Sequence, residues 1–233
     1  MEWSPVLGGV VGSTAYGLAG PESDVDRLVF AAAPTVAFHG FSMPVGRRAS
    51  RVSTSPDVTV HEVGKALHLV LQANPTVSEL LWLDEYEHQT ELGRELVAIR
   101  GQLIGAHAAR DAYLGYAVSQ FKRLKLRGES FSSATAGRTG KHARHLMRLC
   151  TQIRDLWWSG TLSVRVDNPE RFHAFGRVME DDPEQGVAMA ESMLSMTSMA
   201  LDSRTPALPM EPNVALAEDW LIRVRAHYFR EAA

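Results

Sequence analysis

The sequence predicts an α+β fold in which a small mixed β-sheet with flanking helices precedes a mostly helical region. Short apolar or β-branched runs separated by glycine, proline and serine fill much of the first sixty residues, which is typical of neighbouring strands. Beyond them the apolar residues recur at helical spacing. The 233 residues suffice for two joined parts that each bury a core. We place the division at 1–95 and 96–233.

Two short strands are expected near the N-terminus. VLGGVV at 6–11 and VDRLVF at 25–30 are apolar or β-branched, and the residues between them include glycine, serine and proline, which favour turns. Residues 31–56 mix proline, glycine, serine and threonine with three arginines. This composition predicts a long connection or a mobile loop.

A third strand is expected at 57–63, where the sequence reads DVTVHEV. Side chains of a strand alternate between its two faces. Asp57, Thr59 and His61 would therefore share one face, opposite the valines. The segment predicts a strand with one polar face.

The remainder of the chain is helical in pattern. A helix that starts after Glu62 should stop at Asn74-Pro75, because proline cannot continue a helix, and a short helix follows at 76–83. The glycine- and serine-rich stretch 128–140 predicts a flexible loop. Further helices are expected at about 91–99, 103–127, 141–158, 184–201 and 213–229.

Charge is distributed unevenly, although the formal net charge is only −3. Residues 1–99 hold 6 Lys and Arg against 12 Asp and Glu, residues 100–154 hold 11 against 2, and residues 155–233 hold 7 against 13. A basic middle third attracts phosphate, either of a nucleoside triphosphate or of a nucleic acid. It fits a solvated helix surface as well.

Residues 10–30, VVGSTAYGLAGPESDVDRLVF, carry the strongest functional signal. Their glycines lack the G-x-G-x-x-G spacing of a dinucleotide-binding loop, and no lysine precedes Lys65, which excludes a P-loop. The stretch offers instead two carboxylates, Asp24 and Asp26, one residue apart. In a strand these two side chains would point to the same side.

Such a pair of hard oxygen ligands suits Mg²⁺ or Mn²⁺, which then bind substrate phosphate as well. Gly12 would let the backbone approach a phosphate, and the Ser13 hydroxyl would bind its oxygens. A third carboxylate would allow two ions about 4 Å apart. We favour Asp57 over Glu62, which falls on the opposite face of its strand. A solvated acidic turn is the simpler alternative.

These residues resemble the catalytic core of nucleotidyltransferases of the DNA polymerase beta superfamily. The matching features are Gly12-Ser13, Asp24-Val25-Asp26 after ten further residues, and a later strand that begins with Asp57. The fuller pattern is similar to a subgroup of predicted bacterial and phage nucleotidyltransferases. It reads GS-x-A-Y-G-x-x-x-P-x-S-D-x-D, then DVTVHEVGKALHLVLQANPTVSELLW and K-H-x-x-H-L-x-R-L. The chain departs from the pattern at Arg27, where many members have an apolar residue, and by the insert 31–56.

The resemblance implies an enzyme that moves a nucleoside monophosphate from a nucleoside triphosphate, such as ATP, to an acceptor hydroxyl and releases pyrophosphate. Gly12 and Ser13 would hold the triphosphate. Asp24, Asp26 and Asp57 would bind two Mg²⁺, or Mn²⁺, and Asp57 would help to activate the hydroxyl. The acceptor would be an RNA end or another nucleic acid, a protein side chain or a small molecule.

Cations elsewhere in the chain are further candidates for nucleotide binding. Lys65 follows the strand that contains Asp57. In the helix predicted at 141–158, one face carries Lys141, Arg144 or His145, Arg148 and Gln152. Lys141, His145 and Arg148 would neutralise a triphosphate in a cleft completed by the helical part. A solvated helix face explains this row equally well. The apolar stripe expected on the same helix consists of Leu146, Leu149, Ile153 and Leu156.

Two other functions are compatible with the sequence. One is a metal-dependent nucleotide-sugar transferase that uses the D-x-D pair, and the other is a non-catalytic, antitoxin-like protein that binds a partner through its helices. No apolar run approaches the roughly 18 residues of a membrane-spanning helix, and the N-terminus lacks the pattern of a signal peptide. We therefore expect a cytoplasmic protein without a membrane partner.

Overall fold

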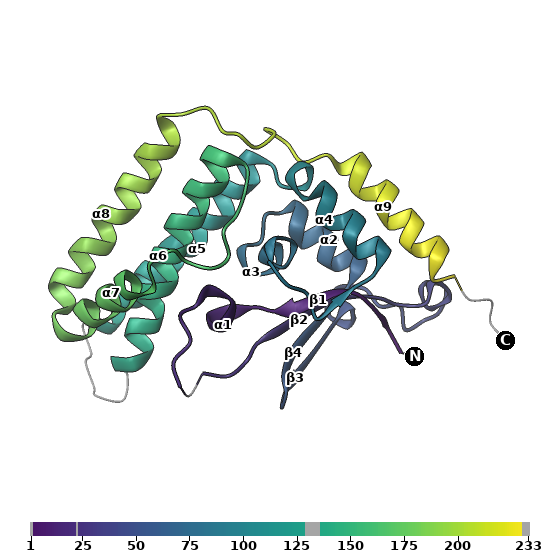
Figure 1. The fold of residues 1–233 in the computed structure, drawn as a ribbon, viewed down its shortest axis with the longest axis horizontal. Coiled ribbons are helices and arrows are strands. Elements are labelled where there is room, and N and C mark those ends of the chain that lie inside the picture. The colour runs from purple at the N-terminus through teal and green to yellow at the C-terminus, as the bar shows by residue number, and fades with distance from the viewer. Residues whose placement is uncertain (1, 22, 129–135, 230–233) are drawn as a thin grey trace. The chain divides into compact units, whose positions relative to one another are not determined.

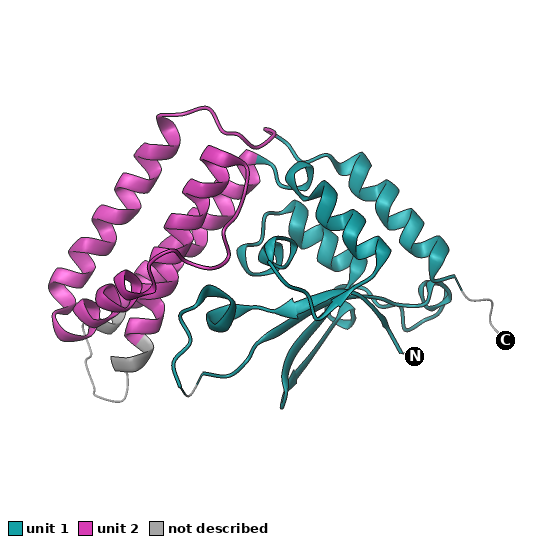
Figure 2. Ribbon diagram, viewed as in Figure 1, with its two compact units in different colours: residues 1–105, 211–233 teal, residues 106–210 magenta. Residues whose placement is uncertain are grey.

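The chain forms two compact units in the computed structural model, which describes residues 2–21, 23–128 and 136–229 (Figure 2). Residues 1–105 and 211–233 make the first unit, and residues 106–210 make the second. The first contains the sheet and the second is helical, so the predicted α+β fold is confirmed. The division expected after residue 95 falls inside a helix, and the C-terminal helix belongs to the first unit.

A five-stranded mixed sheet forms the centre of the first unit, with the strand order β3-β4-β2-β1-β5. β2 and β4 are parallel, whereas the other neighbouring strands are antiparallel. The strands are β1 (Ser4–Val10), β2 (Arg27–Ala32), β3 (Ser50–Thr54), β4 (Asp57–Glu62) and β5 (His88–Gln89). The three strands expected from the sequence are present as β1, β2 and β4.

The segment expected to be an irregular connection, 31–56, contains regular structure. Thr35–His39 and Gly46–Ala49 are 3-10 helices, and β3 forms an antiparallel hairpin with β4. The expectation is therefore wrong for these residues. β3 is an edge strand in which Val52 is 70% exposed, so it lacks the apolar alternation that reveals a half-buried strand.

Helices cover one face of the sheet. α2 (Val63–Leu71), α3 (Pro75–Ser78) and α4 (Glu91–Leu103) lie on this face, and α9 (Val214–His227) packs against α2 and α4 (Figure 1). As predicted, the break falls at Asn74-Pro75. The Asn74 side chain accepts hydrogen bonds from the backbone N–H groups of Thr76 and Val77, and Pro75 occupies the first turn of α3, where its missing N–H costs nothing.

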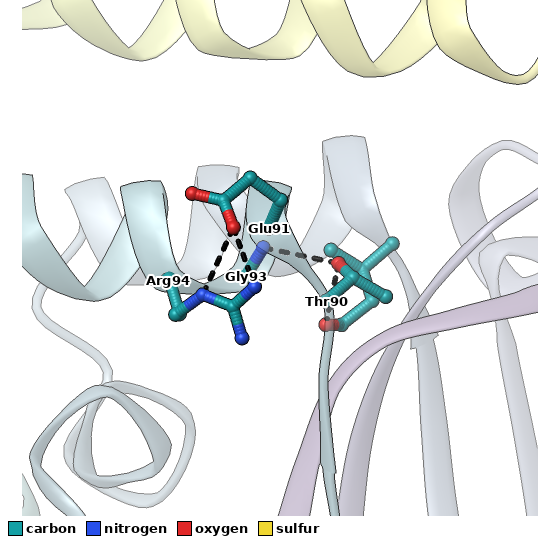
Figure 3. A network of polar contacts seen from close by, with 5 residues as sticks. Thr90, Glu91, Gly93 and Arg94 are labelled. Carbon is teal, nitrogen blue, oxygen red and sulfur yellow. Dashed lines mark hydrogen bonds and ion pairs between the residues drawn. The ribbon is translucent and has the colours of Figure 1, made fainter.

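The start of α4 is attached to β1 (Figure 3). The Thr90 hydroxyl donates to the carbonyl of Val6 and accepts from the N–H of Gly93, at 3.1 Å in both cases. A Cβ on Gly93 would lie 2.4 Å from the same Val6 carbonyl oxygen, so only glycine permits this approach. Arg94 pairs with Glu91 on the exposed side.

The opposite face of the sheet carries a smaller apolar cluster. Trp3, Val29 and Ala31 are buried in it, and Val58 and Val60 pack against them. The Arg51 guanidinium lies 4.0 Å from the centroid of the Trp3 ring. The valines of β4 therefore face this cluster, and the polar residues of β4 face the helices.

The second unit consists of α5 (Ala106–Gly128), α6 (Ala136–Ser159), α7 (Pro169–Asp181) and α8 (Pro183–Asp202). α6 contacts the other three helices. The stripe Leu146, Leu149, Ile153 and Leu156 is fully buried, as expected. α7 is an additional helix, and most of the loop expected at 128–140 lies outside the described residues. In the part of the chain that the structure describes, no helix is long and apolar enough to cross a membrane.

Candidate active site

A cavity of about 210 Å³ lies in the first unit between the helix-covered face of the sheet and α3. It is lined by residues of β2, β4 and α3, by the residues that directly follow β1, and by the residue before β2. Among them are Gly12, Asp26, Asp57, Thr59 and His61. The alternation predicted for β4 is therefore confirmed, because Asp57, Thr59 and His61 all line the same cavity. Gly12 and Asp26, from the stretch 10–30, meet Asp57, from a later strand, in this cavity.

Asp26 directly precedes β2, and Asp57 is the first residue of β4, the parallel strand beside β2. Arg27 pairs with Val58 at the start of the β2–β4 ladder, and the two aspartates precede this pair at corresponding positions. The backbone N–H of Val11 donates to the carbonyl of Asp26 at 2.9 Å, which holds Asp26 against the end of β1. Both carboxylates are partly buried and both line the cavity.

Asp24 lies differently from Asp26. β2 begins only at Arg27 and residues 23–26 are irregular, so the alternation of a strand, on which the joint orientation of the two side chains was predicted, does not apply. Asp24 is exposed and is not part of the cavity lining. Of the D-x-D pair, the structure brings Asp26 alone beside Asp57.

Gly12 and Ser13 begin α1 (Gly12–Tyr16), the short helix that follows β1. Gly12 has φ of 69°, and a Cβ at this position would lie 2.2 Å from Oδ2 of Asp26. Glycine therefore allows the turn and also leaves room for the Asp26 carboxylate. Ser13 follows directly and is partly buried.

A buried hydrogen bond attaches α1 to the 3-10 helix Glu79–Trp82, which follows α3 in the first unit. The Tyr16 hydroxyl donates to both carboxyl oxygens of Glu79, at 2.8 and 2.7 Å, and the Glu79 residue is fully buried. Both residues lie within the motifs that carry the family resemblance, GS-x-A-Y-G and NPTVSELLW. The motifs therefore pointed to these two residues, but they did not show that Tyr16 and Glu79 are hydrogen-bonded to each other.

Lys65 does not line the cavity. It belongs to α2, and its ammonium group donates to the Ser50 hydroxyl at 2.6 Å and to the carbonyl of Gly46 at 3.5 Å. The same Ser50 oxygen lies 2.8 Å from Nδ1 of His61. Burial, and then the positive charge of Lys65, lower the pKa of His61 below its usual value. Sequence reasoning placed His61 on the polar face of its strand but gave it no function.

Glu62, the alternative third carboxylate, faces away from the cavity. Its carboxylate forms a two-point ion pair with Arg225 of α9, with N–O distances of 2.5 and 2.9 Å, and it also accepts from the backbone N–H of Gly64. The residue is 1% exposed. These partners give Glu62 a structural task, capping α2 and fixing α9.

The three candidates from the helical part lie on α6 of the second unit. Lys141 is exposed and His145 is partly buried, whereas Arg148 is 1% exposed instead of lying on an open cationic face. Arg148 donates to the Gln152 side chain at 2.5 Å, and its other terminal nitrogen lies 3.2 Å from Nδ1 of His145. Burial and neighbouring cations, Arg148 first among them, lower the pKa of His145 to about 3.

Two carboxylates of the cavity, those of Asp26 and Asp57, are suited to bind a magnesium ion. Within the described residues, no group of three or more His, Cys, Asp or Glu side chains is gathered to hold a metal. Mg²⁺, however, is usually held by one or two carboxylates and takes its other ligands from water and substrate phosphates. Asp26 and Asp57, side by side in one cavity, meet this requirement.

The sequence places the chain among the nucleotidyltransferases of the DNA polymerase beta superfamily. The chain belongs to the RlaP family, the RNA repair pathway DNA polymerase beta family, whose model matches residues 6–172. The resemblance drawn from the sequence is thereby confirmed.

Among solved structures, the chain is similar to a nucleotidyltransferase-like protein from Exiguobacterium sibiricum 255-15. The two share 15% sequence identity, the match covers 99% of this chain and 76% of the other, and the TM-score is 0.33. No curated protein matches the sequence significantly.

Proposed function

We propose that this protein is a metal-dependent nucleotidyltransferase that transfers a nucleoside monophosphate from a nucleoside triphosphate to the hydroxyl of an RNA end, releasing pyrophosphate. The observation that carries the proposal is the meeting of Gly12, Asp26 and Asp57 in one cavity of a chain that belongs to this family. RNA is the proposed acceptor because the family is described by an RNA repair pathway.

Asp26 and Asp57 would hold Mg²⁺ or Mn²⁺, which supplies charge stabilisation for the transferred phosphoryl group and for the attacking and leaving oxygens. Gly12 provides close backbone approach for the triphosphate, and the Ser13 hydroxyl binds its oxygens. Asp57 orients the acceptor hydroxyl and accepts its proton. Asp24, on the exposed segment before β2, has a secondary role at most.

Incubation with labelled nucleoside triphosphates, Mg²⁺ and RNA tests the proposal. Asp26→Asn and Asp57→Asn should each lower the rate of RNA labelling by about 100-fold or more, because each loses a carboxylate that would hold the metal. Asp84→Asn is the matched control, since Asp84 is an exposed carboxylate of the same unit. Equal labelling by wild type and Asp26→Asn would refute the mechanism.

Release of pyrophosphate, measured in the same reactions, separates nucleotidyl transfer from the transfer of a sugar. In-line attack on the α-phosphate frees one pyrophosphate for each nucleotide added. Labelling without pyrophosphate would contradict the proposed reaction.

A further inference from the structure

Three polar side chains form a hydrogen-bonded chain at one end of the cavity. The Lys65 ammonium of α2 donates to the Ser50 hydroxyl of β3 at 2.6 Å, and this hydroxyl lies 2.8 Å from Nδ1 of His61 in β4. Only His61 of the three lines the cavity. The nucleotidyl transfer proposed above uses none of them.

The direction of the Lys65–Ser50 hydrogen bond is fixed by its donor. An ammonium group can only donate, so the Ser50 oxygen accepts from Lys65. The Ser50 oxygen has a second lone pair, so its bond with Nδ1 of His61 runs in the direction that the tautomer of the ring sets. When Ser50 donates this bond, the two bonds strengthen each other because each polarises the next. A neutral imidazole that accepts at Nδ1 carries its proton on Nε2. Burial and the Lys65 charge, which lower the pKa of His61, favour this neutral ring.

His61 lies at the far end of the cavity from the carboxylates. Asp57, Thr59 and His61 occupy alternate positions of β4, so His61 is about 13 Å from Asp57 along the strand, at about 3.3 Å per residue. Between them the lining is mixed, because Leu28 of β2 and Val77 of α3 are apolar and Thr59 of β4 is polar. The cavity therefore runs from an acidic end, past the apolar side chains of Leu28 and Val77 and the hydroxyl of Thr59, to His61.

The size of the cavity limits what it can hold. Its volume of about 210 Å³ is below the roughly 300–1,000 Å³ of sites that enclose a whole drug-sized ligand. It would hold one part of a nucleoside triphosphate. A flat, largely apolar group with polar atoms at its edge fits a slot between a sheet and a helix, with apolar side chains along it and a donor at its end.

We propose that this end of the cavity is the nucleobase subsite, in which Nε2–H of His61 donates a hydrogen bond to an acceptor atom at the edge of the base. Ser50 and Lys65 are positioning residues that keep the proton of His61 on Nε2. The inference rests on the proposed function for the identity of the ligand. Because the bases differ in the donors and acceptors along their edges, His61 would make binding selective for the base.

The tautomer of His61 is tested without any nucleotide. In protein labelled with ¹⁵N-histidine, the ring nitrogens of His61, assigned by their loss in His61→Gln, should show a protonated Nε2 and an unprotonated Nδ1. Ser50→Ala removes the partner of Nδ1 and should give a mixture of tautomers. A wild-type ring protonated at Nδ1 would overturn the proposal.

Binding of the four nucleoside triphosphates with Mg²⁺, measured by calorimetry, tests the subsite. His61→Ala should reduce the ratio of affinities between the best and the worst nucleotide by about 5- to 10-fold, the value of one neutral hydrogen bond. His61→Gln, whose amide can place an N–H near the position of Nε2, should keep most of the selectivity. His68→Gln is the control, because His68 is an exposed histidine of α2.

The outcomes separate this inference from the proposed function. RNA labelling with unchanged base selectivity in His61→Ala would defeat the inference and leave the function intact. Base-selective binding through His61 without any transfer to RNA would support the inference and contradict the proposed function. A change confined to the KM of the RNA acceptor would overturn the inference, because the cavity would then hold the acceptor.

Discussion

The carboxylate of Asp26 occupies the space that a side chain at position 12 would need. A Cβ built on Gly12 would lie 2.2 Å from Asp26 Oδ2. Gly12 also has φ of 69°, a left-handed conformation that costs any other residue about 1–2 kcal/mol. Two independent constraints, one of the backbone and one of the neighbouring carboxylate, therefore require glycine here.

We expect Gly12→Ala to lower the free energy of unfolding by more than the roughly 1–2 kcal/mol of the backbone term, because the methyl group must also displace Asp26. Gly46→Ala is the matched control, since Gly46 has φ of 58° with no atom within 4 Å of a built Cβ. Urea denaturation measures both variants. Adding Asp26→Ala to Gly12→Ala should recover the excess, and strictly additive losses would contradict the argument.

Because Tyr16 donates a buried hydrogen bond to Glu79, we expect removal of its hydroxyl to lower the free energy of unfolding. Tyr16→Phe should destabilise the first unit by about 1–3 kcal/mol, because a fully buried carboxyl group loses a donor. Tyr228→Phe is the control, as no hydrogen bond of the Tyr228 hydroxyl is present among the described contacts. Urea denaturation monitors both variants, and equal stabilities would show that the Tyr16 bond contributes nothing.

Local patterns predicted the parts of the site that depend on local geometry. The alternation of DVTVHEV placed Asp57, Thr59 and His61 on one face, and all three line the cavity. Alternation failed to predict the position of Asp24 because alternation applies only within a strand, and β2 begins at Arg27. α7 was missed although its start has clear signals, the Asn168 cap and Pro169.

Contacts between distant segments could not be predicted. Trp220 Nε1 of α9 donates to the carbonyl of Leu92, and Arg225 pairs with Glu62, 163 residues away in the sequence. These contacts pack the C-terminal helix α9 against the rest of the first unit. Amphipathic spacing shows that a helix has an apolar face but not which surface this face covers.

The Arg225–Glu62 ion pair separates the two candidates for the third carboxylate. Glu62→Gln should cost about 3 kcal/mol of stability, because it leaves a partly buried guanidinium without its anion. Transfer activity per folded molecule should be kept, whereas Asp57→Asn should lose activity and keep most of its stability. Activity assays at a temperature where each variant is folded decide between them. An inactive but folded Glu62→Gln would reverse the assignment.

The lowered pKa of His145 should make the stability of the protein depend on pH. Burial first, then the charges of Arg148, His142, Arg123 and Lys141, lower its pKa to about 3 in the folded protein, against about 6.5 in the unfolded chain. Between these values the unfolded chain binds more protons, so stability falls as the pH drops below about 6.5.

For His145 alone, the free energy of unfolding should fall by about 1–2 kcal/mol between pH 6.5 and pH 5. Urea denaturation across this range measures the slope. His145→Gln cannot bind the proton and should flatten it, whereas His68→Gln, which changes an exposed histidine of the other unit, should leave it unchanged. If His145→Gln and wild type lose stability in parallel, His145 does not resist protonation in the folded state.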